Sequence, residues 1–161
     1  LVPQIASAVK VPVIAAGGIA DGRGLAAALA LGAQGVQMGT RFICSDECIA
    51  HPKFKQQIIQ SQDRSTVVTG QSTGHPVRCL ENKLTRQFAA MEKSGAAKAE
   101  LEEFGRGRLY LGVIQGNIEE GSLMAGQIAG LITDVKPVKQ IILDIMAEAE
   151  GTVEKFSKFK S

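Results

Sequence analysis

The sequence predicts an α/β protein, namely the C-terminal portion of a (β/α)8 TIM barrel with an inserted small, mostly helical domain. Residues 11–42 have the pattern of a strand, a helix and a second strand, and a glycine-bearing loop follows each strand. Residues 45–120 show helical spacing without a second repeat of this pattern. We therefore expect the last two barrel units in residues 1–44, a smaller, mostly helical domain in residues 45–120, and further helices in residues 121–161.

The first predicted strand, residues 11–16, reads VPVIAA and is followed by Gly17 and Gly18. An unbroken apolar run of this kind is typical of a strand buried on both faces in a parallel sheet. Asp21 is expected to cap a helix over residues 22–31, and residues 35–42 are expected to form the second strand. Together they predict one βαβ unit.

The two glycine-bearing loops are candidates for binding a phosphate group. Backbone N–H groups at a glycine-rich turn and at a helix N-terminus can approach an anion without a side chain in the way. Barrel enzymes often bind phosphate at the loops after their last two strands. The predicted binding residues are Gly17, Gly18, Gln37, Met38, Gly39 and Thr40, with the Thr40 hydroxyl as an added donor. The alternative is that these glycines only form tight turns.

Several further elements are expected downstream. Residues 66–69 are expected to form a short strand, and a helix is indicated by the spacing of Leu80, Leu84, Phe88 and Met91. Residues 122–132, rich in small side chains, are expected to form a helix capped by Ser122. A last amphipathic helix is expected to begin near Pro137 and to end at Gly151, followed by a surface tail with Lys155, Phe156, Lys158, Phe159 and Lys160.

The composition excludes several classes of protein. Eighteen basic and 16 acidic residues give a net charge of +2, which argues against a dedicated nucleic-acid surface. No apolar run is long enough for a membrane helix, and the N-terminus has no signal-peptide pattern. Cys44, Cys48 and Cys79 fit structural thiols in a reducing compartment, so we expect a cytoplasmic protein without a metal site. Because residue 1 is Leu and residues 1–8 resemble the end of a helix, we expect this chain to be part of a larger protein.

Five segments together resemble the superfamily of flavin-dependent nitronate monooxygenases and type II enoyl-acyl-carrier-protein reductases. They read VPVIAAGGIADG at 11–22, LGAQGVQMGTRF at 31–42, GHPVR at 74–78, NKLTR at 82–86 and GSLMAGQIAG at 121–130. The resemblance covers nearly the whole chain in order. It implies that the bound phosphate belongs to FMN, with Gly17, Gly18, Gln37, Gly39 and Thr40 on the phosphate side. It also implies that residues 45–120 are a lid-like inserted domain and that the helices of residues 121–161 return to the barrel.

Within this superfamily, the GHPVR and NKLTR segments are more similar to the enoyl reductases. The resemblance thus implies reduction of an enoyl thioester on acyl-carrier protein, in fatty acid synthesis, with NAD(P)H as co-substrate. One alternative is a nitronate monooxygenase, which oxidises alkyl nitronates with oxygen. A second is a non-catalytic phosphate- or flavin-binding fragment that needs a partner half. We also expect a homo-oligomer or contact with the remaining half of the barrel, and no nucleic acid or membrane partner.

The catalytic residues are expected upstream of this chain, because an essential histidine of both families precedes the matched region. His75 is a weak candidate that could face the active-site cleft, and His51 is expected at the surface.

Two further groups of side chains could contact ligands. Arg78, Lys83 and Arg86 are expected to form a basic cluster that meets phosphates of NAD(P)H or of the acyl carrier, unless they are only a solvated face. A second group could line the flavin cleft: Ser122, Met124 and Gln127.

Overall fold

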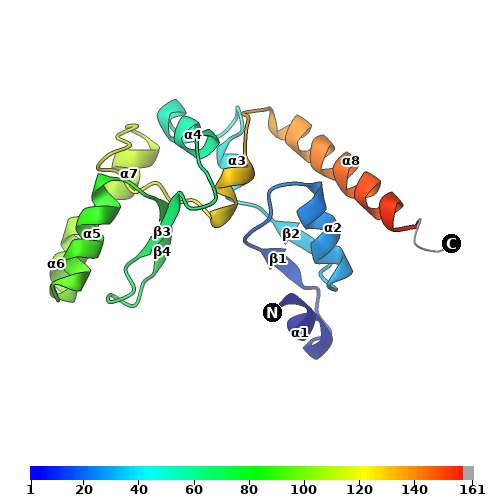
Figure 1. The fold of residues 1–161 in the computed structure, drawn as a ribbon, viewed down its shortest axis with the longest axis horizontal. Helices are drawn as coiled ribbons and strands as arrows, with labels where there is room; N and C mark the ends of the chain where they lie inside the picture. The colour runs from blue at the N-terminus through cyan, green and yellow to red at the C-terminus, as the bar shows by residue number, and fades with distance from the viewer. Residues whose placement is uncertain (158–161) are drawn as a thin grey trace. The chain divides into compact units, whose positions relative to one another are not determined.

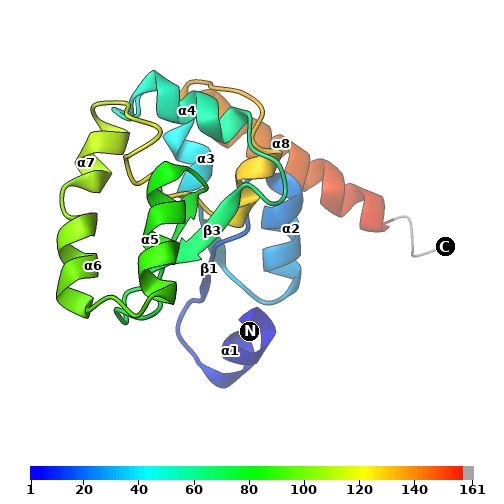
Figure 2. The same ribbon diagram turned by 60° about the vertical axis from the view of Figure 1, so that its left-hand side comes forward.

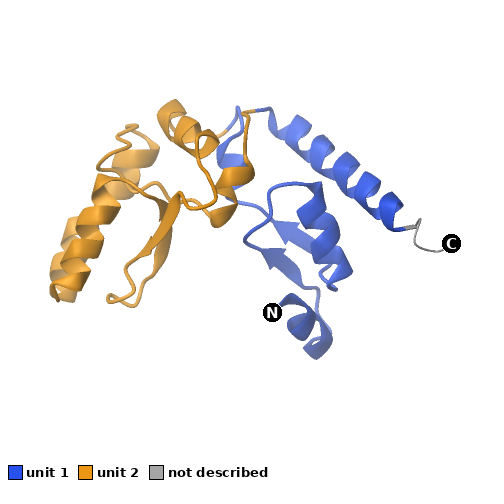
Figure 3. Ribbon diagram, viewed as in Figure 1, with its two compact units in different colours: residues 1–47, 136–161 blue, residues 48–135 orange. Residues whose placement is uncertain are grey.

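The computed structural model describes residues 1–157 of the chain and divides it into two compact units (Figure 3). Unit 1 contains residues 1–47 and the chain from residue 136 onward, and unit 2 contains residues 48–135. Residues 121–135, which the sequence analysis grouped with the returning helices, thus belong to unit 2. The reason is local pairing: the Leu80 N–H donates to the Leu123 carbonyl at 2.9 Å, and Met124 forms a β-bridge with Cys79.

Unit 1 is built on a βαβ arrangement, as predicted (Figure 1). Strands β1 and β2 pair in parallel, and the helix α2 between them is capped by Asp21, whose side chain accepts from the Gly24 N–H at 3.0 Å. The elements of unit 1 are α1 (Val2–Ala8), β1 (Ile14–Ala16), α2 (Gly22–Ala30), β2 (Gly35–Gln37), α3 (Thr40–Ile43) and α8 (Val138–Ser157).

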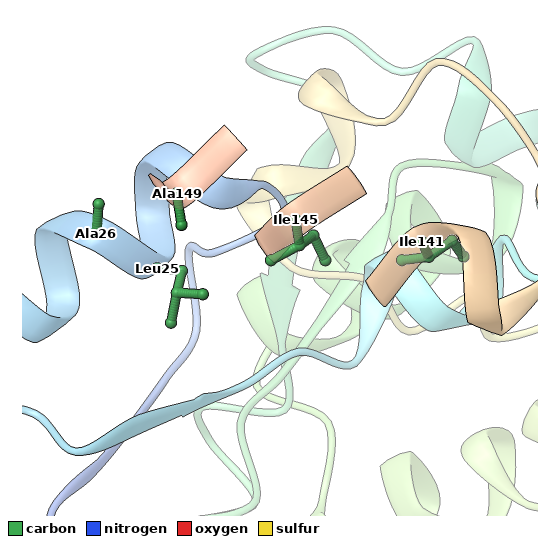
Figure 4. Close-up of a cluster of buried hydrophobic side chains, with 5 residues drawn as sticks. All are labelled: Leu25, Ala26, Ile141, Ile145 and Ala149. Atoms are coloured by element: carbon green, nitrogen blue, oxygen red, sulfur yellow. The ribbon is translucent and has the colours of Figure 1, made fainter. Parts of the chain in front are cut away.

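The core of unit 1 lies where α8 packs against α2 (Figure 4). Its buried side chains are Leu25, Ala26, Ile141, Ile145 and Ala149. Gly22, the first residue of α2, lies directly against the α8 backbone, so a Cβ atom at this position would overlap the main chain of Ile145 and Ala149. The small residues therefore allow the two helices to approach closely.

Three expectations for unit 1 were wrong in detail. Residues 40–43 form a helical turn instead of extending the second strand, because Gly39 is the N-cap of α3. Strand β1 was expected to be buried on both faces, but only Ala15 is buried and the Ile14 side chain is 54% exposed. The reason is that, within residues 1–157, β1 pairs with β2 alone. Helix α8 continues through Gly151, because a single glycine lowers helix stability by only about 1 kcal/mol.

Unit 2 combines a β-hairpin with short helices (Figure 2). Strands β3 and β4 are antiparallel, and the turn between them uses Gly70 and Gly74 at φ of +79° and +81°. The elements of unit 2 are α4 (Pro52–Ile59), β3 (Thr66–Thr69), β4 (Val77–Leu80), α5 (Lys83–Lys93), α6 (Lys98–Gly105), α7 (Arg108–Val113) and the 3₁₀ helix η1 (Gln127–Leu131).

The predicted strand at residues 66–69 is confirmed, but its partner β4 was missed. Leu80, expected in the following helix, is the last residue of β4. Helix α5 begins only after Asn82, whose side chain accepts from the Thr85 N–H at 3.0 Å in a capping box. Leu80 and Leu84 are therefore four positions apart but belong to two different elements, so their spacing is not that of one helix.

The helix expected over residues 122–132 was also wrong. Met124 lies in an extended bridge, and only η1 is helical in this segment. Glycine at positions 126 and 130 disfavours a regular helix. Gly130 lies against the backbone of Gln62 and Asp63, where a larger residue would have no room.

None of the helices in residues 1–157 combines the length and the apolar character that crossing a bilayer requires. At the C-terminus, Lys155 and Phe156 are exposed on α8, as expected for a surface helix. The predicted tail positions Lys158, Phe159 and Lys160 lie outside the described residues.

Candidate functional site

The two predicted phosphate loops lie at the same edge of the parallel strand pair. In the β1–β2 register, Ala16 is opposite Gln37. Gly17 and Met38 therefore both leave the sheet at its carboxyl edge, and the two loops that follow are neighbours. Ligands of α/β proteins usually bind at this edge of parallel strands.

The glycines of these loops are exposed and leave open space beside their backbone. Gly17 and Gly18 have φ of +92° and +71°, a conformation that side-chain-bearing residues rarely adopt. Gly39 has an ordinary φ of −94°. A Cβ atom at any of the three would meet no other atom within 4 Å. Main-chain conformation thus explains Gly17 and Gly18, whereas neither conformation nor packing within this chain explains Gly39.

The other predicted phosphate-site residues differ in exposure. Gln37 is exposed at the end of β2. Met38 is half-buried and packs against the α2–α8 core, so its side chain has a structural role. Thr40 is 8% exposed and already interacts with other groups of the chain. The loop backbone therefore provides most of the accessible surface of this candidate site.

The N-terminus of α2, expected to help bind the phosphate, already faces two carboxylates. The Gly22 N–H donates to Glu148 at 2.8 Å, and the Gly24 N–H donates to Asp21. Burial raises the pKa of Asp21, but hydrogen bonds from Arg23 and Gly24 outweigh that effect and lower the pKa below its usual range. Because these N–H groups are satisfied by negative charges, α2 is a poor anion site, and the candidate site is confined to the two loops.

Arg41 is a buried charge that the sequence analysis did not single out. It is 7% exposed and directly follows Thr40. Hydrogen bonds from Lys136 and Gln140 to Asp144, at 2.8 and 2.7 Å, are the main causes that lower the pKa of Asp144, and the charge of Arg41 adds to them. This group of charges links the loop after β2 to α8. The sequence offered one signal for Arg41, namely its position directly after the predicted phosphate loop.

Unit 2 contains a cavity of about 270 Å³ that receives several of the predicted ligand contacts. His75, Ser122 and Met124 line it, whereas Gln127 does not. His75 is exposed, and the Ser122 hydroxyl lies 3.4 Å from the Cys79 sulfur. The backbone pairing of residues 123–125 with β4, which the sequence did not reveal, brings these side chains together.

The expected basic cluster does not form. The Arg78 guanidinium donates to the Thr66 hydroxyl at 3.1 Å across the hairpin, while Lys83 and Arg86 form ion pairs with Glu120 and Glu81. Arg78 lies on β4, whereas Lys83 and Arg86 lie on α5. The three side chains therefore do not share one helix face.

His51 was expected at the surface, but it is half-buried and caps α4. Its Nδ1 accepts from the Lys53 N–H at 3.1 Å. The free cysteines Cys44 and Cys79 are buried and Cys48 is half-buried. Within residues 1–157 no group of three His, Cys, Asp or Glu side chains is placed to hold a metal ion.

Comparison with known proteins gives consistent matches across this chain. The sequence profile of the nitronate monooxygenase family matches residues 1–148. A probable nitronate monooxygenase of Bacillus subtilis (strain 168) is 36% identical over 148 residues, covering 92% of this chain and 43% of that protein.

Two solved structures are also similar. FabK from Thermotoga maritima has 50% identity and a TM-score of 0.95, over 99% of this chain and 50% of that one. A nitroalkane oxidase from Streptomyces ansochromogenes has 29% identity and a TM-score of 0.79, over 97% of this chain and 44% of that one. The chain thus spans about half of the length of these relatives.

Proposed function

Because the chain belongs to the nitronate monooxygenase family, a family of flavin-dependent oxidoreductases, we propose that it is the C-terminal part of an FMN- and NAD(P)H-dependent enoyl-acyl-carrier-protein reductase. Unit 1 would then be the end of the (β/α)8 barrel, and unit 2 the inserted domain. The observation that carries this choice is the similarity to FabK, which we take as the enoyl-reductase branch of the family. Identity is 50% to FabK and 29% to the nitroalkane oxidase, at nearly equal coverage of this chain.

The residues at the carboxyl edge of β1 and β2 fit the phosphate end of FMN. Gly17 and Gly18 place their backbone in a left-handed turn, and Gly39 leaves room that no atom of this chain occupies. Outside the sheet ladder, none of these three residues donates a backbone hydrogen bond within residues 1–157. Such N–H groups, with those of the turn at Thr40, would hold the phosphate and so orient the flavin.

When bound, FMN would supply the redox chemistry that a hydride transfer between NAD(P)H and an enoyl thioester requires. The described residues would contribute anchoring and positioning: the loop backbone would hold the phosphate, and the charges around Arg41 and Asp144 would fix the loop after β2 against α8. We assign no catalytic base within residues 1–157. The proposal places that group in the part of the protein that precedes this chain, with acyl-carrier protein or an acyl thioester as the partner.

An activity comparison with the full-length protein tests the proposal. We expect NADH- or NADPH-dependent reduction of a crotonyl thioester, which is measured as the loss of NAD(P)H absorbance. Oxygen uptake with an alkyl nitronate should be slow in the same preparation. Turnover of nitronate alone would show that the proposal is wrong.

The second candidate is nitronate monooxygenase itself. It is supported by the family profile and by the name of the Bacillus subtilis relative. Both candidates use the same phosphate anchor, so loss of FMN binding would not separate them. Only the substrate comparison does so.

A further inference from the structure

The cavity of unit 2 is lined by residues of the β-hairpin and of the helices α5, α6 and α7. Val77 and Cys79, alternate residues of β4, form one wall. Leu84, Leu101 and Leu109 line it from α5, α6 and α7. Its volume of about 270 Å³ exceeds the roughly 150 Å³ of an apolar cavity that is known to bind benzene. Because some of its lining residues, among them His75 and Gly105, are exposed, the cavity opens to solvent and a ligand can enter it.

Polar groups on the cavity wall are largely satisfied within the chain. The Thr73 hydroxyl donates to the Gly70 carbonyl at 2.8 Å, and the Thr85 hydroxyl donates to the Asn82 carbonyl at 3.0 Å. Hydroxyl groups used in this way offer a ligand little further hydrogen bonding. The remaining surface is mainly aliphatic and aromatic.

Four charged or titratable side chains line the cavity. Glu102 and His75 are exposed, and Glu102 faces Lys98 at 3.7 Å. The other two are Cys79 and Arg108. Burial raises the pKa of the Cys79 thiol and outweighs its contact with Ser122, so the thiol stays protonated near neutral pH. Arg108 stacks over the Phe104 ring at 5.1 Å and faces Glu120 at 3.7 Å. An interior with these properties favours a hydrocarbon over an ionic ligand.

We propose that this cavity binds the hydrocarbon chain of a medium-length fatty acyl compound. The inference rests on the proposed function, since an enoyl thioester brings such a chain to the enzyme, and a free fatty acid presents the same chain. His75 and Gly105 line the cavity and are exposed, so they mark its mouth. The far end of a long chain would enter there, while the thioester and the enoyl carbons stay outside the cavity. The cavity would then set the preference for chain length.

Gly105 allows the mouth to be narrowed without disturbing the fold. A Cβ atom there would lie 3.8 Å from the Phe88 ring, an ordinary contact, and the backbone is helical. The substitution Gly105→Leu therefore places a branched side chain beside Phe88 in the mouth. Gly151→Leu is the matched control, because Gly151 lies within α8 and a Cβ atom there would meet nothing within 4 Å.

The first experiment measures KM in the full-length flavoprotein for trans-2-decenoyl and crotonyl thioesters. Gly105→Leu should raise KM for the decenoyl substrate about tenfold, because several methylene groups lose their apolar site. The four-carbon crotonyl chain is too short to reach the cavity, so the same substitution should not discriminate against the crotonyl substrate. Gly151→Leu should change the KM of neither substrate. Equal effects on both substrates, or no effect on either, would overturn the proposal.

The second experiment measures decanoate binding by titration calorimetry without a thioester. Wild type and Gly151→Leu should bind decanoate, and Gly105→Leu should bind it about tenfold more weakly. Absence of binding in the wild type, together with equal KM values for the two thioesters, would overturn the cavity assignment. If Gly105→Leu does not fold, Leu109→Trp at the half-exposed Leu109 should give the same loss.

The two experiments separate the cavity proposal from the proposed function. If decanoate binding depends on Gly105 but no thioester is reduced, the cavity site is supported and its ligand is a free fatty acid. If thioesters are reduced but neither Gly105→Leu nor Leu109→Trp changes chain-length preference or decanoate binding, the cavity site is rejected and the proposed function is kept.

Discussion

At the scale of single residues, Gly39 separates ligand binding from folding. Its backbone conformation is open to any residue, and a methyl group there would meet no atom of this chain. Gly39→Ala should therefore change the free energy of unfolding by less than about 0.5 kcal/mol. We expect it to weaken FMN binding about tenfold or more, because the methyl group takes space proposed for the phosphate. Titration of the full-length apoprotein by quenching of flavin fluorescence measures this.

Gly18→Ala provides the contrasting control for this prediction. At φ of +71° an alanine is strained, so this variant should lose roughly 1 kcal/mol of stability as well as FMN affinity. Normal FMN affinity in Gly39→Ala would place the phosphate elsewhere.

The charges around Asp144 predict a pH effect on stability. Hydrogen bonds from Lys136 and Gln140 lower the pKa of Asp144, with the charge of Arg41 adding to them. A carboxyl whose pKa is lower in the folded state contributes stability above its unfolded pKa, and this contribution disappears as the pH falls through the folded pKa. Asp144→Asn should therefore lower the urea midpoint of the full-length protein at neutral pH. The difference from wild type should shrink below about pH 4. A difference that is constant with pH would contradict the assignment.

How well single residues could be predicted depends on what determines them. A glycine pair after an apolar run identifies a tight turn locally, and the φ values of Gly17 and Gly18 agree with that expectation. The role of Glu148 at the N-terminus of α2 could not be inferred from the sequence. Its carboxylate accepts a hydrogen bond from the Gly22 N–H, which is 126 residues away along the chain. The same holds for Arg41, whose charge acts on Asp144 of α8. Their contribution to an FMN site stays a prediction.

At the scale of elements, the packing of α2 against α8 gives a sharp test. Gly22→Ala should destabilise the full-length protein by about 1–3 kcal/mol, because its Cβ atom would overlap the α8 backbone at Ile145 and Ala149. Gly151→Ala, on the same helix pair but facing open space, should instead stabilise by roughly 0.5–1 kcal/mol. Chemical denaturation of both variants measures the two free energies. Equal values would show that α2 and α8 do not pack in this way.

Elements were predictable where local signals agreed with tertiary pairing. The capped helix α2 and its flanking strands follow from Asp21 and the apolar runs beside it. The end of α8 was misplaced, since packing along its length outweighs the low helix propensity of Gly151. The extended segment at Met124 was missed, because it pairs with Cys79, 45 positions away. Strand β4 pairs locally with β3, but it was missed because Leu80 matched the apolar spacing of the following helix.

At the scale of the whole molecule, unit 1 exposes apolar surface that the described chain does not cover. Val11 and Ile14 on the first strand segment are 67% and 54% exposed, and β1 and β2 pair only with each other within residues 1–157. Ile142, Met146 and Val153 of α8 are also exposed. Unpaired strand edges and apolar faces promote association.

We therefore expect the purified 161-residue chain to associate and to bind FMN poorly, consistent with a fragment that needs a partner half. Sedimentation velocity and the flavin absorbance spectrum measure the two properties. A monomer with one equivalent of tightly bound FMN would contradict this prediction. A longer chain that covers the exposed strands should restore both monodispersity and flavin binding.

The sequence by itself determined the βαβ unit, the glycine turns after its strands and the family to which the chain belongs, because these depend on short runs of neighbouring residues. Only the tertiary structure decided that carboxylates occupy the N-terminus of α2, that Arg41 is buried beside the Asp144 group, and that residues 123–125 pair with β4 beside a cavity. Each of these depends on contacts between residues far apart in the chain, whose pairing is set by packing and by main-chain hydrogen bonds.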